Sequence, residues 1–531
     1  MKRVISLLMA VCLIVSLLAA CGGKSGDPVE SNKAEASSDK YRDYYQVWIG
    51  SFCDSNNDQI GDLPGVISKL DYLNDGDPNG GNDLGVDGIW LSPMMPSQSY
   101  HKYNVSDYFN IDPDFGTLED FDKLIKECHE RGVKVIIDLV LNHSGDDHEF
   151  FLKAGEELRK GKEDGYARYY NISKQKDSTY NRRVPGSDYY YEGQFDVTMP
   201  DWNLSYQGTR DYFDKVTKFW LDRGVDGFRL DAIKHFEDGN TDGVEFMKWF
   251  YQMAQGYNPD VYMVGENWSG AGDIYEMYDS GIDSQFNFKF AGDNGGEFII
   301  ASHGMVADMA TKLKKFDDGI KKHNEKAINA NFLTNHDMQR LYSILDEGDN
   351  KMAAALYMLA PGNTFTYYGE EIGIEAPSSD GDANYRTAMI WDNDDLPDIK
   401  FLGSPPVQKN ELGGVAQQLE QKHSLLNTYR KLIKIRQQNP EIARGNIEKV
   451  VDFGDTSCTG MVINYNDSRV MVIHNGGKEA KELTIDAIEK PELRGWSVAD
   501  LAAEPSEDVP KLSKTTLSVP ARTSVVLKEK K

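Results

Sequence analysis

Carboxylate, histidine and cationic side chains follow apolar strand candidates at four places in the chain, a pattern suited to acid–base chemistry. They lie in the segments DLVLNH (138–143), GFRLDAIKH (227–235), VGENW (264–268) and FLTNHD (332–337). The acids Asp231, Glu266 and Asp337 need an explanation, because an unpaired buried carboxylate costs several kcal/mol. Glycosidic bond cleavage supplies one, since one carboxylic acid protonates the departing oxygen while a carboxylate acts on the opposite face of the sugar. The alternative is that each acid pairs with a nearby cation, as Asp231 could with Arg229.

The elements that must position these residues follow a repeated pattern, in which an amphipathic helix ends at glycine and a β-branched strand follows. Segments with this pattern lie at 84–91, 130–138 and 223–230, and further strand candidates lie at 45–49, 261–264, 284–288, 330–333 and 364–367. Runs this apolar are typical of parallel strands buried on both faces. Eight such strands alternating with helices predict an α/β fold, a (β/α)8 TIM barrel whose strand ends meet at one mouth. A doubly wound open sheet is the alternative, but no Gly-x-Gly-x-x-Gly opens a helix after an early strand.

The residue composition and the pattern of predicted elements change outside this repeat. Residues 144–207 lack the helix–strand alternation and are rich in Tyr, Gly, Asp and Asn, so we expect an inserted domain after the third strand. From residue 447, short alternating strands separated by Asn-Gly-Gly and Pro predict a C-terminal β-sandwich that extends to residue 531. The barrel is then expected to comprise residues 41–143 and 208–446, with its last helix near 423–438.

The first residues are predicted to be a targeting segment. Lys2 and Arg3 precede an apolar run that ends in Leu-Ala-Ala before Cys21, which is the layout of a signal peptide over residues 1–20. A permanent membrane helix is the alternative, because about 17 apolar residues are the lower limit for spanning a bilayer. The Leu-Ala-Ala-Cys sequence resembles the lipobox of bacterial lipoproteins, which implies a lipidated Cys21 and an extracytoplasmic protein anchored to the membrane or cell surface. Residues 21–40 then form a flexible spacer.

The composition excludes some partners. A net charge of −27 repels phosphate backbones, so nucleic-acid binding is not expected. We also expect the protein to be a monomer. Without Cys12 and Cys21 the chain has three cysteines, which can form at most one disulfide. Their spacing does not suggest metal ligation, and we interpret them as buried small hydrophobic residues.

The chain closely resembles the α-amylase family of glycoside hydrolases from about residue 41 to the C-terminus. Seven segments occur in the family's order: GIWLSP (88–93), DLVLNH, MPDWN (199–203), GFRLDAIKH, VGENW, FLTNHD and YYGEEIG (367–373). The family implies a catalytic barrel, an inserted domain B and a C-terminal sandwich. It also implies that Asp231 is the nucleophile, Glu266 the general acid/base and Asp337 the transition-state stabiliser. Because the family retains anomeric configuration, Asp231 and Glu266 should lie about 5 to 5.5 Å apart.

The resemblance also implies substrate-binding residues. His143 and His336 match hydrogen-bonding histidines around the sugar in subsite −1, and Tyr103 matches the aromatic platform beneath that sugar. Arg229 would keep Asp231 ionised, and the Lys234–His235 pair matches residues that touch the +2 sugar in α-1,4-acting amylases. The family more often has Gly-Tyr-Asp where this chain has Lys102-Tyr103-Asn104, so the contacts beside Tyr103 must differ.

The segment DSNNDQIGD (54–62) has the spacing of a calcium loop. Calcium prefers hard oxygen ligands on a flexible loop, and the expected donors are Asp54, Asn56, Asp58, the carbonyl of Ile60, and Asp62. Gln59 stands where glycine usually permits the sharp turn, and an acidic surface turn is the alternative. Within the family this loop commonly binds a structural calcium.

These patterns predict a retaining, endo-acting glycoside hydrolase that cleaves α-1,4-glucosidic bonds in starch, maltodextrins and related α-glucans. Ala232 fits the amylase pattern, whereas MPDWN is intermediate between the forms in oligo-1,6-glucosidases and neopullulanases. A neopullulanase, cyclomaltodextrinase or transglycosylase using the same site is one alternative. A catalytically silent glucan-binding surface lipoprotein is another, although binding alone needs no acid pair.

Overall fold

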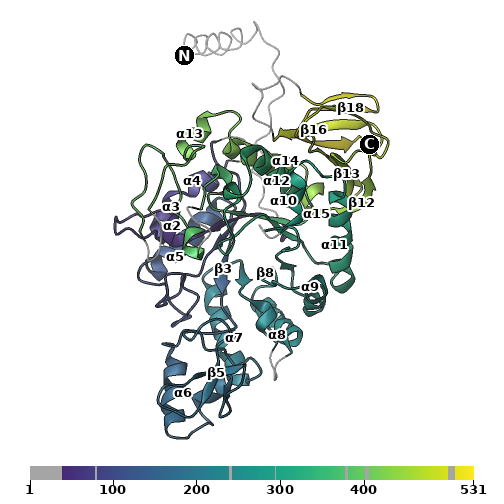
Figure 1. Ribbon diagram of the computed structural model, residues 1–531. Coiled ribbons are helices and arrows are strands. Elements are labelled where there is room, and N and C mark those ends of the chain that lie inside the picture. Colours follow the sequence, from purple (N-terminus) through teal and green to yellow (C-terminus); the bar gives the residue numbers. More distant parts are fainter. Residues whose placement is uncertain are drawn as a thin grey trace, which may run out of the picture. The chain divides into compact units, whose positions relative to one another are not determined.

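A computed structural model describes residues 39–77, 81–237, 242–292, 295–376, 381–400, 406–499 and 509–530 (Figure 1). The predicted signal peptide and lipidated Cys21 lie outside these residues. In the described ranges, no helix combines the length and apolar character needed to cross a membrane. The three cysteines in these ranges form no disulfide; Cys128 and Cys458 are buried, and Cys53 is half-buried.

Eight parallel strands form a barrel, as predicted. They are β1 (Asp43–Val47), β2 (Gly88–Leu91), β3 (Lys134–Leu139), β7 (Gly227–Leu230), β8 (Tyr262–Gly265), β9 (Ser284–Gln285), β10 (Ala330–Phe332) and β11 (Asn363–Tyr367). Their order in the sheet is β10-β11-β1-β2-β3-β7-β8-β9, and a parallel bridge between Phe286 and Ala330 joins the two edges. The open-sheet alternative is therefore wrong. The strand predicted at 284–288 ends at Gln285, because Phe288 and Phe290 donate main-chain hydrogen bonds within a turn.

A cluster of buried aromatic and aliphatic side chains fills the barrel interior. It includes Tyr44, Trp90, Ile136, Tyr262, Val264, Phe286, Ala330, Phe332 and Phe365. The Tyr44 ring stacks on Phe365 at 4.7 Å and on Tyr262 at 5.4 Å between centroids. A Cβ atom at Gly88 would lie 2.4 Å from the Tyr44 ring, so only glycine leaves room for it. Strand β7 adds no apolar side chain to this cluster, and its Arg229 side chain is buried instead.

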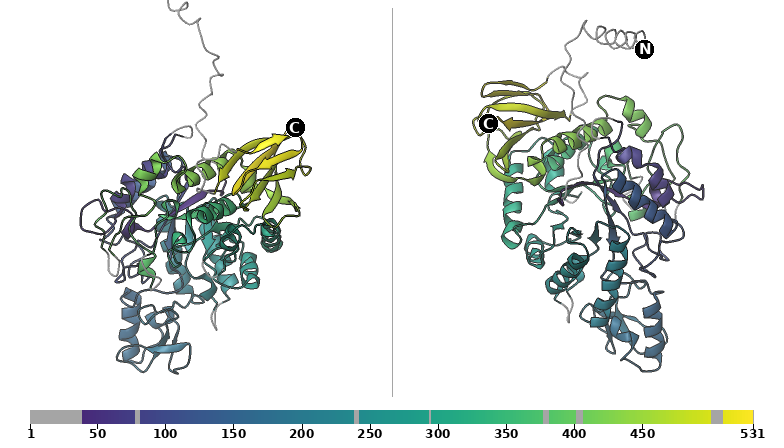
Figure 2. Two further views of the ribbon diagram at one scale, coloured as in Figure 1. Left: turned by 45° about the horizontal axis from the view of Figure 1, so that its top comes forward. Right: turned by 180° about the vertical axis from the view of Figure 1, so that it is seen from behind.

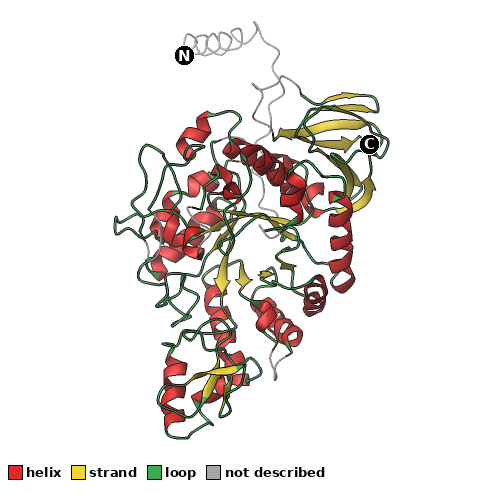
Figure 3. Ribbon diagram, viewed as in Figure 1, coloured by secondary structure: helices red, strands yellow, loops and turns green. Residues whose placement is uncertain are grey.

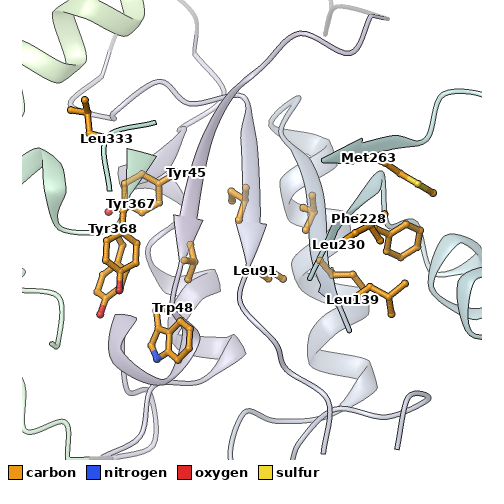
Figure 4. Close-up of a cluster of buried hydrophobic side chains, with 14 of the residues drawn as sticks. Tyr45, Trp48, Leu91, Leu139, Phe228, Leu230, Met263, Leu333, Tyr367 and Tyr368 are labelled. Atoms are coloured by element: carbon orange, nitrogen blue, oxygen red, sulfur yellow. The ribbon is translucent and has the colours of Figure 1, made fainter. Parts of the chain in front are cut away.

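The opposite faces of the strands pack against the surrounding helices. A second and larger cluster of buried apolar side chains lies between the strands and these helices. It includes Leu91, Leu139, Leu230 and Met263 (Figure 4). Helices and short helical turns alternate with the barrel strands (Figure 3): α2 (Ile49–Phe52), α3 (Leu63–Ser68), α4 (Leu70–Leu73), α5 (Leu118–Glu130), α7 (Gln207–Asp222), α8 (Gly243–Tyr257), α9 (Ala271–Met277), α10 (Glu297–Ser302), α11 (Met309–His323), α12 (Glu347–Met358), α13 (Val415–Glu420), α14 (Leu425–Gln438) and α15 (Glu441–Arg444). Burial on both faces explains why the strand sequences are almost continuously apolar.

The connection after β3 contains its own small elements. They are α6 (Glu149–Arg159), β4 (Ile172–Ser173), β5 (Tyr180–Arg183) and β6 (Tyr190–Glu192), and the three strands form an antiparallel sheet. The rings of Tyr170 and Trp202 stack at 4.6 Å. A bridge from His143 to Asp201 brings the two ends of the connection together, and a bridge from Tyr170 to Trp202 joins its middle to its end. The inserted segment thus begins and ends at the same place on the barrel.

The C-terminal residues form a module of two antiparallel sheets, drawn in yellow in Figure 2. Its strands are β12 (Asn446–Val451), β13 (Cys458–Tyr465), β14 (Ser468–Asn475), β15 (Lys481–Thr484), β16 (Pro491–Val498), β17 (Lys511–Ser513), β18 (Thr516–Val519) and β19 (Thr523–Glu529). The sheet orders are β12-β13-β14-β19-β16 and β15-β18-β17. One buried cluster contains Met471 and Leu527 from the first sheet and Leu483 and Leu517 from the second. This shared core makes the module a sandwich, as predicted.

Candidate active site

Arg229 is the centre of a buried network at the ends of three neighbouring strands. Its Nη1 atom lies 2.8 and 3.0 Å from the two carboxylate oxygens of Asp138 and 2.7 Å from Oδ1 of Asp231. Its Nη2 atom lies 3.0 Å from Oε2 of Glu266. Asp138 is in β3, Asp231 directly follows β7, and Glu266 directly follows β8. The structure therefore brings Asp231 and Glu266, which are 35 positions apart in the sequence, onto one guanidinium.

The three carboxylates are buried around one cation, and their pKa values reflect that burial. Burial raises the pKa of Asp138 to about 7, against the opposing attraction of Arg229. Burial also raises the pKa of Glu266 to about 8, and the charges of Asp231 and Asp337 act in the same direction. For Asp231, burial raises the pKa and the contact with Arg229 opposes that shift. Glu266 is thus suited to carry a proton at neutral pH, as a general acid must.

The main chain fixes the carboxyl group of Glu266 from the other side. Ala232 adopts the left-handed conformation, with a φ of 48°, and its N–H donates a 3.0 Å hydrogen bond to Oε2 of Glu266. This conformation is uncommon for a residue other than glycine, and such outliers often lie at functional sites. The turn that follows β7 therefore places Asp231 at the strand end and also orients Glu266.

Asp337 is held by a second set of contacts at the same mouth. Its Oδ1 accepts a 2.8 Å hydrogen bond from Nη2 of Arg386, and its Oδ2 lies 3.0 Å from Nε2 of His336. The Asp337 side chain is 30% exposed, more than those of Asp231 and Glu266. Arg386 also donates to the carbonyl oxygen of His336 at 3.0 Å. A buried cation thus orients this third acid while leaving part of it accessible.

Tyr103 and His336 connect the two halves of the network. The Tyr103 hydroxyl lies 2.6 Å from Nε2 of His336, 3.2 Å from Oδ2 of Asp138 and 3.2 Å from Nη1 of Arg229. Nδ1 of His336 lies 2.8 Å from the amide nitrogen of Gln46. That nitrogen can only donate, so the hydrogen-bond network assigns the His336 proton to Nε2. Burial, with Arg386 and Arg229 nearby, holds the pKa of His336 well below its usual range and keeps the ring neutral.

His143 and His235 contact a side chain of the inserted segment. The Phe195 ring lies 5.2 Å from each imidazole ring between centroids, and Phe195 is one of the exposed large apolar residues. Neither ring nitrogen of His143 has a hydrogen-bond partner of ordinary geometry in the described ranges. Burial lowers its pKa to about 3, with the main chain of Tyr103 acting in the opposite direction. A neutral, buried imidazole with free hydrogen-bonding capacity is suited to a polar ligand.

Lys234 is exposed rather than part of the buried network. Its Nζ donates to the carbonyl oxygen of Trp268 at 3.3 Å. Trp268 follows Glu266 by two positions, is 44% exposed and stacks on Phe288 at 4.7 Å. An exposed, supported aromatic ring beside the network is a natural surface for an apolar sugar face.

The predicted calcium loop forms the connection between α2 and α3. The carboxylate of Asp54 accepts hydrogen bonds from the main-chain N–H groups of Asn56, Asn57 and Gln59 at 3.0, 2.8 and 2.8 Å. The Asp62 side chain accepts from Gly65 N–H at 2.6 Å and caps α3. Throughout the described ranges, no three His, Cys, Asp or Glu side chains gather as a metal centre would require.

Sequence reasoning missed Gln46, Phe195, Trp268 and Arg386. Trp268 lies within the recognised VGENW segment and could have been selected as an exposed aromatic residue beside an acid. Arg386 gave no such signal, because it lies 49 positions after Asp337 in a stretch without strand periodicity. Only the folded chain brings it to the mouth.

We expect Asp337→Asn to lower the pKa of Glu266 below about 8, because it removes one of the negative charges that raise it. A pH titration followed by infrared or carbon-13 signals of the Glu266 carboxyl group measures this value. Asp382→Asn is a matched control, since Asp382 also pairs with Arg386, at 2.8 Å, but its side chain is 46% exposed. An unchanged Glu266 pKa in Asp337→Asn would contradict the electrostatic coupling of these acids.

Comparison with known proteins agrees with this geometry. The α-amylase catalytic-domain family model matches residues 46–445. The chain is 34% identical to α-amylase 3 of Dictyoglomus thermophilum, over 81% of this chain and 84% of that protein. It is 29% identical to an oligo-1,6-glucosidase of Bacillus cereus, over 81% and 89%.

Solved structures give the same result. Eubacterium rectale Amy13B superposes with a TM-score of 0.85 at 36% identity, covering 93% of this chain and 96% of that one. An α-amylase from H. orenii superposes with a TM-score of 0.81 at 34% identity, covering 93% and 100%. With the barrel and its cluster of acids, these matches show that the chain belongs to the α-amylase family of glycoside hydrolases.

Proposed function

We propose that this protein hydrolyses internal α-1,4-glucosidic bonds of starch and maltodextrins with retention of anomeric configuration. The observation that carries the proposal is the convergence of Asp231 and Glu266 on Arg229, with Asp337 at the same mouth. An ionised acid, a protonated acid and a third charge are what a two-step glycoside hydrolysis requires.

In the first step, the Asp231 carboxylate attacks the anomeric carbon as the bond to the departing oxygen breaks. Glu266 gives its proton to that oxygen, so the leaving sugar departs as a neutral alcohol and a glycosyl ester remains on Asp231. In the second step, Glu266 accepts a proton from water, whose oxygen attacks the anomeric carbon and releases Asp231. Asp337 stabilises the positive charge that develops on the sugar ring in both steps.

The surrounding side chains support a role in binding the reacting sugar. The Tyr103 ring lies parallel to the His336 ring, 5.7 Å between centroids, and offers an aromatic surface to an apolar pyranose face. His143 has unused hydrogen-bonding capacity. Lys234 and His235 lie on the turn after the nucleophile, where the resemblance assigns contacts with the +2 sugar.

The relatives leave the bond preference open to experiment. They include an α-amylase at 34% identity and oligo-1,6-glucosidases at about 29%. We favour α-1,4 cleavage because the Lys234–His235 pair and Ala232 follow the amylase pattern. A neopullulanase, cyclomaltodextrinase or transglycosylase that uses the same site is the second candidate. The exposed Trp268 ring favours it, since this ring could bind a sugar acceptor in competition with water.

We also propose that the loop from Asp54 to Asp62 binds a structural calcium ion. The donor oxygens expected there are those calcium prefers, and no ion pair in the described ranges involves Asp54, Asp58 or Asp62. Gln59 adopts a φ of 78° and Asn57 a φ of 66°, so the loop makes its sharp turns without glycine. The hydrogen bonds to Asp54 and Asp62 leave lone pairs on both carboxylates for a cation.

We further propose that the protein acts as a monomeric, extracytoplasmic lipoprotein anchored through Cys21. The charged start, the apolar run and the Leu-Ala-Ala-Cys sequence support this localisation. One lipid modification at the chain's beginning would tether the barrel rather than embed it.

Product analysis on amylose, pullulan and maltotriose tests the proposed reaction. We expect a range of short maltooligosaccharides from amylose, with α-configured reducing ends and little cleavage at the α-1,6 bonds of pullulan. Asp231→Asn should abolish these products while leaving the circular dichroism and melting temperature near those of the wild type. Exposed Asp222→Asn is the matched control and should keep full activity. Near-normal turnover by Asp231→Asn would remove the nucleophile assignment, and glucosyl transfer products from maltotriose would establish the second candidate.

Removing calcium should lower the melting temperature, because a ligand bound only by the folded state stabilises it by about 2.7 kcal/mol at 100 times its Kd. Differential scanning calorimetry with and without excess chelator measures this change. Asp58→Ala should melt earlier and lose its response to chelator, whereas Asp394→Asn, in another acidic turn, should respond as the wild type does. An unchanged melting curve in chelator would contradict the calcium proposal.

Replacing Cys21 tests the anchor. In the native host, Cys21→Ser should move the protein from the membrane fraction to the soluble fraction, because the lipid-bearing thiol is gone. The kcat and KM for maltotriose should stay the same, since Cys21 lies outside the barrel sequence. Retention in the membrane fraction would show that the apolar run itself, rather than a lipid, holds the protein there.

A further inference from the structure

Lys102 occupies a backbone conformation that favours glycine, directly before Tyr103. Its φ is 64°, and its N–H donates a 3.3 Å hydrogen bond to the carbonyl oxygen of Ser99. The left-handed conformation costs energy for a residue with a Cβ atom and persists only where surrounding contacts enforce it. Some interaction of the lysine side chain must therefore compensate for this strain.

The Lys102 side chain supplies that interaction. Its ammonium group lies 2.8 Å from Oδ2 of Asp112, and only 7% of the lysine side chain and 6% of the aspartate side chain are exposed. A second carboxylate, Asp114, lies 3.1 Å away and is half exposed. The same ammonium lies 5.4 Å from the centre of the Phe115 ring. A charged lysine this deeply buried is rare unless it is paired.

Asp112 in turn holds the other arm of the loop. Its Oδ2 accepts a 3.1 Å hydrogen bond from the N–H of Ser97, and Ser97 forms an antiparallel bridge with Val105. Ser106 N–H donates to the carbonyl of Pro96 at 2.8 Å. The ion pair therefore ties the turn before Tyr103 to both arms of the loop that carries it.

The hydroxyl group of Tyr103 is where this loop meets the acid network. It contacts His336, Asp138 and Arg229 within 3.2 Å. A displacement of the loop by about 1 Å would break or lengthen these hydrogen bonds, and misplacements of that size can cost up to about a hundredfold in rate.

We propose that Lys102 is a positioning residue, whose buried ion pair with Asp112 locks the turn that places Tyr103 at the mouth before any sugar binds. Glycine would allow the turn but also many other conformations. The lysine accepts a strained backbone conformation and fixes the loop through its side chain, so the Tyr103 ring is held in place before the substrate binds. This inference rests on the proposed glycosidase activity, in which Tyr103 supports the reacting sugar.

Kinetics of Lys102→Met, Lys102→Gly and Asp112→Asn test the proposal. We expect each to lower kcat/KM by about tenfold or more, by the same factor for maltotriose and maltoheptaose, because both substrates place a sugar on Tyr103. The double variant Lys102→Met/Asp112→Asn should be no worse than the single variants, since partners in one interaction are not additive. Lys102→Arg, which keeps the charge, should recover most of the activity.

Lys351→Met is the matched control. Lys351 is also buried and pairs with Glu347 at 3.0 Å on α12, so its loss should lower the melting temperature without changing kcat/KM of the folded enzyme. If Lys102→Met and Lys102→Gly behave like this control, Lys102 is a purely structural residue and the proposal fails. Lys102→Gly removes the strain as well as the charge, so it keeps the test open if Lys102→Met does not fold. A wild-type protein inactive on α-glucans would instead refute the proposed function itself.

Discussion

The site depends on a single buried guanidinium. Arg229 is 1% exposed, lies 5.3 Å from the centre of the Trp90 ring and faces the carboxyl groups of Asp138, Asp231 and Glu266. Burial raises the pKa of these acids, and the single positive charge opposes that shift only in part, which favours a bound proton on one of them. Unequal protonation of these acids thus follows from their burial together around one cation.

Other residues at the barrel mouth hold these acids in place. Buried aromatic side chains fill the barrel interior, and the left-handed turn at Ala232 fixes Glu266 through its main-chain N–H. Arg386, a second buried cation at the mouth, is hydrogen-bonded to Asp337 rather than to the first three acids. Tyr103 joins the two groups through its hydroxyl contacts with Arg229 and His336, so its position affects both.

Most of the fold could be predicted from the sequence, because barrel strands buried on both faces have a local signature. Apolar runs, three of them after a glycine that ends a predicted helix, predicted all eight strands, and the short alternating strands predicted the sandwich. The strand at 284–288 was predicted too long, since Phe286 and Phe288 remain apolar after the chain has turned and their side chains fill the barrel interior. Helix α6 in the insertion was not predicted, because the surrounding Tyr- and Gly-rich sequence lacks a regular period.

For the site, the sequence by itself determined which residues end the strands, and so it identified Asp231, Glu266 and Asp337 and the family whose motifs contain them. Only the tertiary structure decided that Arg386 holds Asp337, that Gln46 sets the His336 proton, and that the Lys102 ammonium pairs with Asp112. The physical reason is that strand formation is encoded in neighbouring residues. Hydrogen bonds and ion pairs instead depend on side-chain positions that exist only after segments distant in the chain have packed together.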